Sequence, residues 1–293
     1  MTTFEGEIMA DLQTPPPSSD EAYLMPRCSS LTTKELQQNW REEKRRERPH
    51  SLLFELPSYR VAETIFSKHV VFEVVIMRAG SFDSHRVSVE RRYSDFFKLH
   101  QALLQQFEEE LDEITLPKKL LTGNFNPECL LERQLALQDY VAKLYAKRCV
   151  RYSTHFANFF TDQEMKKAHK LLRAGQFGQC LRLLQLVLEI QEKLAPWQSA
   201  TLTVHTLAAL AVCYRDLEEP EEAYAAAHRA LPAVRRYGLK EYRAPLLEML
   251  VDVGYSLGRP VAQVQEELLG VRDAERGRVD TRSLKEVVVH KFV

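Results

Sequence analysis

The stretch that decides the fold of this chain reads Arg91-Arg92-Tyr93-Ser94-Asp95-Phe96-Phe97. It lies between residues 86–90, which have the composition of a β-strand, and residues 98–104, which have the pattern of a helix. A guanidinium, an aromatic ring and a hydroxyl therefore meet near a helix N-terminus, where the first amides attract anions. Two interpretations follow: a site for a phosphate carried on a ring, or a solvated strand end beside core aromatic residues.

The segments on either side of this stretch have a consistent order. Runs rich in β-branched and aromatic residues predict strands, and runs with helical periodicity follow them. The expected order is strands near 59–66, 70–78 and 85–92, a helix, a basic loop at 116–120, a second helix near 127–146 and a short aromatic helix at 155–160. In these motifs and their spacing, residues 55–161 resemble a phox-homology (PX) domain. The resemblance implies an α+β fold in which a three-stranded antiparallel sheet packs on helices.

The resemblance to PX domains also implies a lipid-binding site. In members that bind phosphatidylinositol 3-phosphate, the 3-phosphate is held by the basic residue that Arg92 matches here. Tyr93 matches the ring that stacks on the inositol, and Ser94 matches the residue that lies against the same phosphate. Lys119 matches the lysine that reaches the 1-phosphate, and Arg133 the arginine that grips the ring hydroxyls. All the expected kinds of ligand-binding residue are therefore present.

The loop that carries the basic residues is shorter than the proline-rich stretch of many PX domains. It holds only Pro117 before Pro127. Leu120, Leu121 and Phe125 adjoin it, and two roles are equally open to them. They either enter the interfacial layer of a membrane or pack in the core of the domain.

Helical periodicity dominates from residue 162 onward. Turns near Gly175, Pro220 and Pro260 recur with a period of about 40 residues, which indicates stacked helix pairs. Residues 162–273 resemble the tetratricopeptide-like module, called PX-associated domain B, that follows the PX domain in the small sorting-nexin 20/21-type subfamily. A stack of this kind leaves a concave surface, which either binds a partner or cargo segment or has no specific ligand.

The two ends of the chain have different compositions. Residues 1–50 are rich in turn-forming and charged residues, which predicts a disordered region that is either a solvated tail or an accessory binding element. Residues 274–293 form a C-terminal tail in which 283–293 have a strand-like composition. This tail either adds a strand to a partner or folds back onto its own module.

Composition and missing motifs exclude several classes of function. The net charge of −1 gives no basic field for nucleic acid, and no stretch reaches the ~20 apolar residues of a membrane-spanning helix. The N-terminus lacks the features of a signal peptide, and five scattered cysteines favour a reducing compartment without zinc or disulfides. No zinc-protease, serine-hydrolase or phosphate-loop motif is present. We therefore expect a cytoplasmic protein that is not an enzyme and has no cofactor or metal.

The resemblance to PX domains and to this subfamily implies a phosphoinositide-binding sorting nexin. It would dock on the cytoplasmic side of early endosomes through phosphatidylinositol 3-phosphate and recruit cargo or a partner protein through its helical module. One alternative is a broader binder that also recognises phosphatidylinositol 4,5-bisphosphate through a second basic surface. The other is a protein scaffold with little lipid selectivity. The residues available for the second basic surface are Arg91, Lys118, Lys143, Lys147, Arg148 and Arg151.

Overall fold

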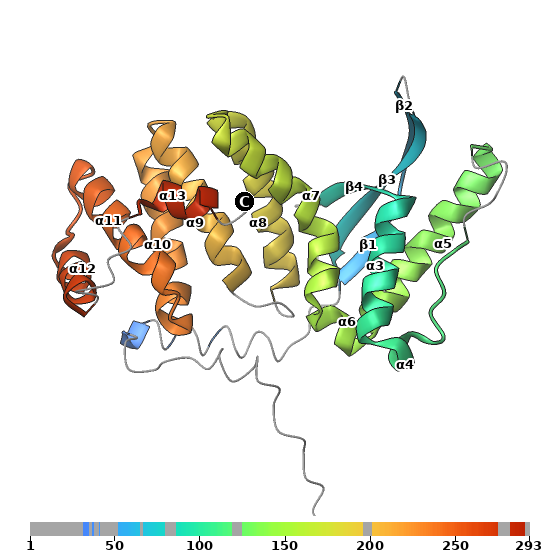
Figure 1. Cartoon of the computed structure of the whole chain (residues 1–293), viewed down its shortest axis with the longest axis horizontal. Helices are drawn as coiled ribbons and strands as arrows, with labels where there is room; N and C mark the ends of the chain where they lie inside the picture. Colours follow the sequence, from blue (N-terminus) through green and yellow to red (C-terminus); the bar gives the residue numbers. More distant parts are fainter. Residues whose placement is uncertain are drawn as a thin grey trace, which may run out of the picture.

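The computed structural model describes residues 32–34, 37, 41, 52–64, 67–79, 86–118, 125–195, 201–274 and 282–290. A sheet-containing part comes first and an all-helical part follows it, side by side along the longest axis of the molecule (Figure 1). The expected α+β fold, with an antiparallel sheet followed by a helical module, is confirmed. The prediction of disorder for residues 1–50 falls almost entirely outside the described residues and stays a prediction.

Within the described residues the sheet has four strands, where the sequence predicted three. They are β1 (Leu52–Glu55), β2 (Tyr59–Thr64), β3 (Ser67–Arg78) and β4 (Val87–Arg92), and β3 pairs antiparallel with the other three. β4 pairs with residues 71–76 of β3, a range that overlaps the partners of both β1 and β2. β1 and β2 therefore pair with the same edge of β3, one after the other, and β4 pairs with the opposite edge. The sheet is therefore three strands wide, and the additional strand is β1, only four residues long and preceding the expected start of the domain at residue 55.

Helices cover this sheet and close its core. They are α3 (Tyr93–Gln106), α4 (Glu108–Leu111), α5 (Pro127–Ala146), α6 (Arg148–Tyr152) and α7 (Thr154–Arg173). Phe96 and Phe160 are fully buried in this core, together with Phe72 of β3. The predicted aromatic helix at 155–160 is only the first part of α7, a helix of 20 residues. Its second part, with Met165 and Leu172, belongs to the core of the helical module. One continuous helix thus serves both cores.

The helical module continues as a series of neighbouring helices. They are α8 (Phe177–Leu194), α9 (Thr201–Asp216), α10 (Pro220–Tyr237), α11 (Lys240–Ser256) and α12 (Ala262–Ala274). Its core is a single cluster of buried apolar side chains drawn from all these helices. Ile190 and Leu194, at the end of α8, are exceptions because they are buried in the core of the sheet-containing part.

Three equivalent turns confirm the internal repeat that the sequence indicated. Each turn closes with a backbone bond from an amide to a carbonyl five residues earlier: Gln176 to Leu171, Glu219 to Tyr214 and Arg259 to Gly254, all 2.9 Å long. The residue before each donor has a positive φ, as such helix ends require. Glycine fills this position in the first and third turns, at φ 70° and 65°. In the second turn Glu218 adopts φ 61°.

The described part of the C-terminal tail is a helix, so the strand-like interpretation is wrong for these residues. The helix, α13, spans Leu284–His290 and packs against α7, α9 and α11. Ser283 and Glu286 form a reciprocal capping box: the Ser283 Oγ accepts from the Glu286 amide at 3.3 Å, and the Glu286 carboxylate accepts from the Ser283 amide at 2.7 Å. The spacing of Leu284, Val287 and Val288 then buries one face of the helix. The other prediction for the tail, that it folds back onto its own module, is the one the structure bears out.

A buried polar chain crosses the helical core. The Nε2 atoms of His169 and His205 are 2.9 Å apart, and Nδ1 of His205 is 2.8 Å from the hydroxyl of Tyr242. These residues lie on α7, α9 and α11, and each is almost fully buried. Burial, with a smaller contribution from Arg173, lowers the pKa of His169 to about 4. The folded state therefore favours the neutral form of this imidazole.

We expect Glu218→Gly to raise the free energy of unfolding by about 0.5–1 kcal/mol. The variant relieves the left-handed strain of Glu218 but adds conformational entropy to the unfolded chain. Urea denaturation checks this value. Glu219→Gly is the matched control, because Glu219 has φ −106° and gains nothing from glycine. Equal effects of the two substitutions would contradict the account of the second turn.

We expect the protein to lose stability as the pH falls from about 6.5 to about 4. The unfolded chain protonates His169 below its ordinary pKa of 6.5, whereas the folded protein does so only near pH 4. The unfolded state therefore binds more protons in this window, and the contribution lost is at most about 3 kcal/mol. Urea denaturation at a series of pH values, beside the non-titrating His169→Gln variant, measures it. Parallel curves for the two proteins would contradict the prediction.

Candidate functional site

The predicted lipid site forms where β4 meets α3. Side chains on a strand alternate between faces, so Arg91 points inward while Arg92 is exposed. The Asp95 carboxylate accepts a hydrogen bond from the Arg92 amide at 2.8 Å, which fixes the change from strand to helix. The fully buried Phe96 anchors the start of α3. Arg92 and Ser94 therefore reach solvent from a rigid junction at a helix N-terminus.

Tyr93 connects three segments that are distant in the sequence. Its hydroxyl donates to the carbonyl of Pro117 at 2.7 Å, and the Arg133 guanidinium lies 5.6 Å from the centre of its ring. Arg133 extends from α5 and is buried. The structure thus brings two of the predicted site residues into contact and places the basic loop beside them.

Part of the predicted site lies outside the described residues. This is the case for Lys119, Leu120 and Leu121. Phe125 is described and is 42% exposed, and the Lys68 ammonium lies 5.3 Å from the centre of its ring. Of the two roles open to Phe125, core packing is therefore excluded. Lys68 is a residue that the sequence did not point to, because only the tertiary structure brings the start of β3 to Phe125.

Arg91 does not belong to any membrane-facing surface. It is 1% exposed, and its guanidinium donates two hydrogen bonds to the Glu164 carboxylate, 2.8 and 2.6 Å long. It also donates to the carbonyls of Phe159 and Glu90. The expectation that Arg91 could help to form a second basic surface is therefore wrong. The ion pair of Arg91 with Glu164 attaches β4 to α7.

The other residues considered for a second basic surface fall in two separate places, because Arg151 lies in α6 with Arg148, next to the end of α5 and far from Lys118. Lys118 is exposed next to Pro117, whereas Lys143, Lys147 and Arg148 lie at the far end of α5 and beyond it. With a rise of 1.5 Å per residue, Arg133 and Lys147 are separated by roughly 21 Å along the helix. Lys143 is also paired with Asp139 at 2.7 Å.

The core behind Tyr93 holds a neutral pair of polar side chains. Nδ1 of His100 and the hydroxyl of Tyr140 are 3.1 Å apart. Burial lowers the pKa of His100, and burial with the nearby Tyr93 raises the pKa of Tyr140. Both groups are uncharged at neutral pH, so the positive charge of the site comes from its arginines and lysines. Within the described ranges, no group of three histidine, cysteine or acidic residues could hold a metal ion.

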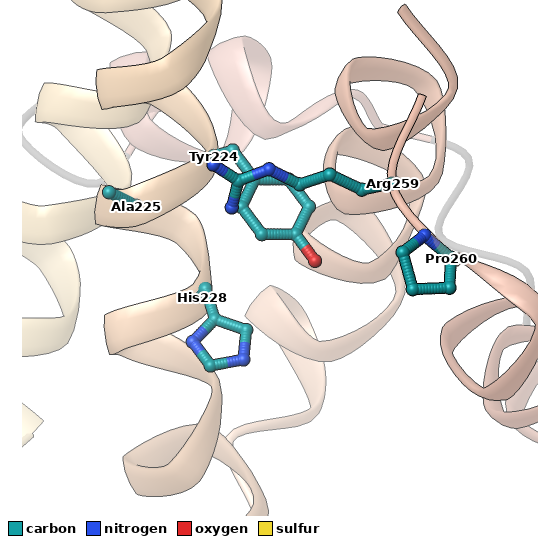
Figure 2. Close-up of a pocket in the computed structure, with 5 residues that line it drawn as sticks. All are labelled: Tyr224, Ala225, His228, Arg259 and Pro260. Carbon is teal, nitrogen blue, oxygen red and sulfur yellow. The ribbon is translucent and has the colours of Figure 1, made fainter. Parts of the chain in front are cut away.

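A second feature of the surface lies in the helical module. A hollow of about 490 Å³ is lined by residues of α10 and of the turn after α11, namely Tyr224, Ala225, His228, Arg259 and Pro260. Figure 2 shows the Arg259 side chain reaching over the Tyr224 ring, 4.4 Å from its centre, with His228 one turn further along α10. Arg259 is also paired with Glu221. Its charge is therefore already matched, and the hollow offers no strong site for an anion.

Comparison with known proteins supports the interpretation of the first part. The PX domain family matches residues 79–163. The chain is 44% identical over 286 residues to Sorting nexin-20 from Rattus norvegicus, covering 95% of this chain and 89% of the relative. Sorting nexin-20 from Bos taurus is 41% identical, covering 90% of this chain and 83% of the relative. Sorting nexin-21 from Mus musculus is 30% identical, covering 99% of this chain and 78% of the relative. The similarity therefore extends over both parts of the fold.

None of the described helices is both long and apolar enough to cross a membrane.

We expect Glu164→Gln to lower the free energy of unfolding by about 3 kcal/mol, because it leaves the Arg91 charge buried without a carboxylate. The matched control is Glu90→Gln, which breaks the Arg60–Glu90 pair at the surface, where both side chains are 57% exposed. An exposed pair of this kind contributes little to stability, because water and salt screen it. Urea denaturation of both variants measures the difference. Equal losses would mean that the buried pair has no special role.

Proposed function

The chain belongs to the sorting nexin family, and from that premise we propose that it docks on early endosomes through phosphatidylinositol 3-phosphate. As a sorting nexin with a PX domain it is a phosphoinositide-binding trafficking adaptor and a peripheral membrane protein. The proposal adds the identity of the lipid, the membrane and the residues that bind the headgroup. It also assigns the recruitment of cargo or a partner protein to the helical module.

The observation that carries the proposal is the position of Tyr93. Its hydroxyl is engaged by Pro117, so the side chain presents its ring rather than its O–H group to a ligand. Arg133 lies beside the same ring, within reach of the hydroxyls of a sugar stacked there. Arg92 and Ser94 extend to solvent on either side of Tyr93 in the sequence. This arrangement suits a phosphorylated ring lying on an aromatic platform.

Each residue has one role in the proposed complex. Arg92 forms charge-assisted hydrogen bonds to the 3-phosphate, which contribute about 1.5–3 kcal/mol each. Ser94 and the first amides of α3 add donors to the same group. Arg133 binds the ring hydroxyls, and Lys119 reaches the 1-phosphate. The selectivity for the 3-phosphate then follows from Arg92, which the strand and helix hold in a fixed position.

Membrane contact beside the headgroup comes from an apolar and basic edge. Phe125 is exposed and lies against Lys68. We assign Phe125, Leu120 and Leu121 to the interfacial layer of the bilayer, with Lys68 among the anionic headgroups. An aromatic ring next to a lysine suits this layer, because the ring is buried in the acyl boundary while the ammonium stays in water.

The test is co-sedimentation of the full chain with liposomes that each carry one phosphoinositide. The wild type should bind those containing phosphatidylinositol 3-phosphate most tightly, and Arg92→Ala should weaken this binding at least tenfold. Arg86→Ala is the matched control, because Arg86 is an exposed arginine just before the same strand and pairs with Glu55. It should bind like the wild type.

Two results would contradict the proposal. Binding that Arg92→Ala leaves unchanged would mean that a diffuse basic surface carries the contact. Equal binding to all phosphoinositides would contradict the proposed selectivity for the 3-phosphate.

In cells, the Arg92→Ala variant should change endosomal puncta into a diffuse cytoplasmic distribution. Its circular dichroism spectrum should stay that of the wild type.

A further inference from the structure

The short C-terminal helix α13 lies across one face of the helical module. Helices α7 to α12 contact one another in sequence order, so α7, α9 and α11 are alternate helices of the stack. α13 packs against these three, and Figure 1 shows it lying across the helical module at α9. We call their shared surface the α7/α9/α11 face. It is the surface on which a stack of helix pairs can hold a peptide or a helix.

The contacts of α13 are those of a docked amphipathic helix. Leu284, Val287 and Val288 are buried in the core cluster, at 2%, 3% and 0% exposure. The Lys285 ammonium lies 2.6 Å from the Asp216 carboxylate and 4.7 Å from the centre of the Phe177 ring. A basic residue is thus held between an acidic group and an aromatic ring at the edge of the face.

Asp216 is an acidic position that the fold maintains. Burial alone would raise its pKa, but hydrogen bonds from Lys285 and Arg215 outweigh burial, and the pKa lies below its ordinary value. The Asp216 side chain is only 15% exposed, and Arg215 pairs with it at 3.0 Å. The carboxylate therefore stays charged and favours a basic residue in the helix that lies on the face.

α13 is attached much less firmly than the helices beneath it. It has seven residues and buries three side chains, whereas α9 buries ten. Two polar contacts add to the apolar ones. Lys285 pairs with Asp216, and Arg173 donates a 3.3 Å hydrogen bond to the carbonyl of Val289. Elements with few buried contacts open locally at low free-energy cost. Local opening of α13 should therefore cost less free energy than opening of a helix of the stack.

We propose that the α7/α9/α11 face binds a short amphipathic helix of a partner protein, and that α13 occupies this face as an intramolecular competitor. The partner helix has the pattern of α13: apolar residues at positions i, i+3 and i+4 and a basic residue at i+1. This inference rests on the proposed recruitment of a partner by the helical module. The test measures peptide binding in the absence of lipid, so a failure of peptide binding is distinct from a failure of the proposed lipid site.

The experiment measures binding of a fluorescein-labelled peptide of residues 282–293 to the full chain by fluorescence anisotropy. In the wild type the tethered α13 competes at an effective concentration of about millimolar. The Val288→Asp variant should release α13, because a carboxylate is costly to bury. It should bind the peptide at least ten times more tightly than the wild type.

A second variant and a charge exchange make the test specific. Lys285→Glu removes the pair with Asp216 at a side chain that is 42% exposed, and it should also increase peptide binding. Adding Asp216→Lys to the Val288→Asp chain should abolish binding of the unaltered peptide. A peptide carrying Lys285→Glu should then bind again.

Three outcomes would overturn the proposal. One is that both variants keep their helical circular dichroism but neither gains peptide binding. Another is that both variants unfold, which would make α13 an integral part of the core. The third is a concentration-dependent dimer of the variants in size-exclusion chromatography, which would make a second copy of the chain the occupant of the face.

Discussion

The buried ion pair between Arg91 and Glu164 is the interaction on which the rest of the structure depends. It attaches the edge strand β4 to the middle of α7, and both oxygens of the carboxylate are engaged by the guanidinium. A buried charge of this kind is tolerated only when its hydrogen bonds are satisfied, so the relative position of strand and helix is tightly fixed. Because Arg92 is the next residue, the same interaction sets where the proposed phosphate-binding side chain leaves the sheet.

The ion pair also joins the two parts of the molecule. α7 contributes Phe156 and Phe160 to the core under the sheet and Met165 and Leu172 to the helical core. The end of α8 returns to the sheet-containing part and packs on β3 and β4. The helical module is therefore joined to the sheet-containing part by shared packing and not by a flexible linker. A membrane bound at the junction of β4 and α3 would hold the module, and its α7/α9/α11 face, in one orientation relative to the bilayer.

Local sequence was sufficient for much of this structure. The run from Arg91 to Phe97 predicted a strand, a helix start and the family, and the comparisons confirm the family and the fold. The recurring turns near Gly175, Pro220 and Pro260 predicted the helical stack, because backbone conformation at such turns depends on residue type. The lipid-site residues were also named from the sequence. Their roles stay a proposal, although Tyr93 and Arg133 prove to be in contact.

The sequence by itself determined what depends on neighbours along the chain: the element types, the signature at the strand end and the position of Arg92 beside a helix N-terminus. Only the tertiary structure decided what depends on distant partners. The charge of Arg91 is buried because Glu164 lies 73 positions away in sequence and faces it. The valine-rich segment Leu284–His290 is a helix because its apolar face is covered by α7, α9 and α11, and this burial outweighs the β-propensity of valine. Contacts between distant segments have no local signature, and they fix the final arrangement.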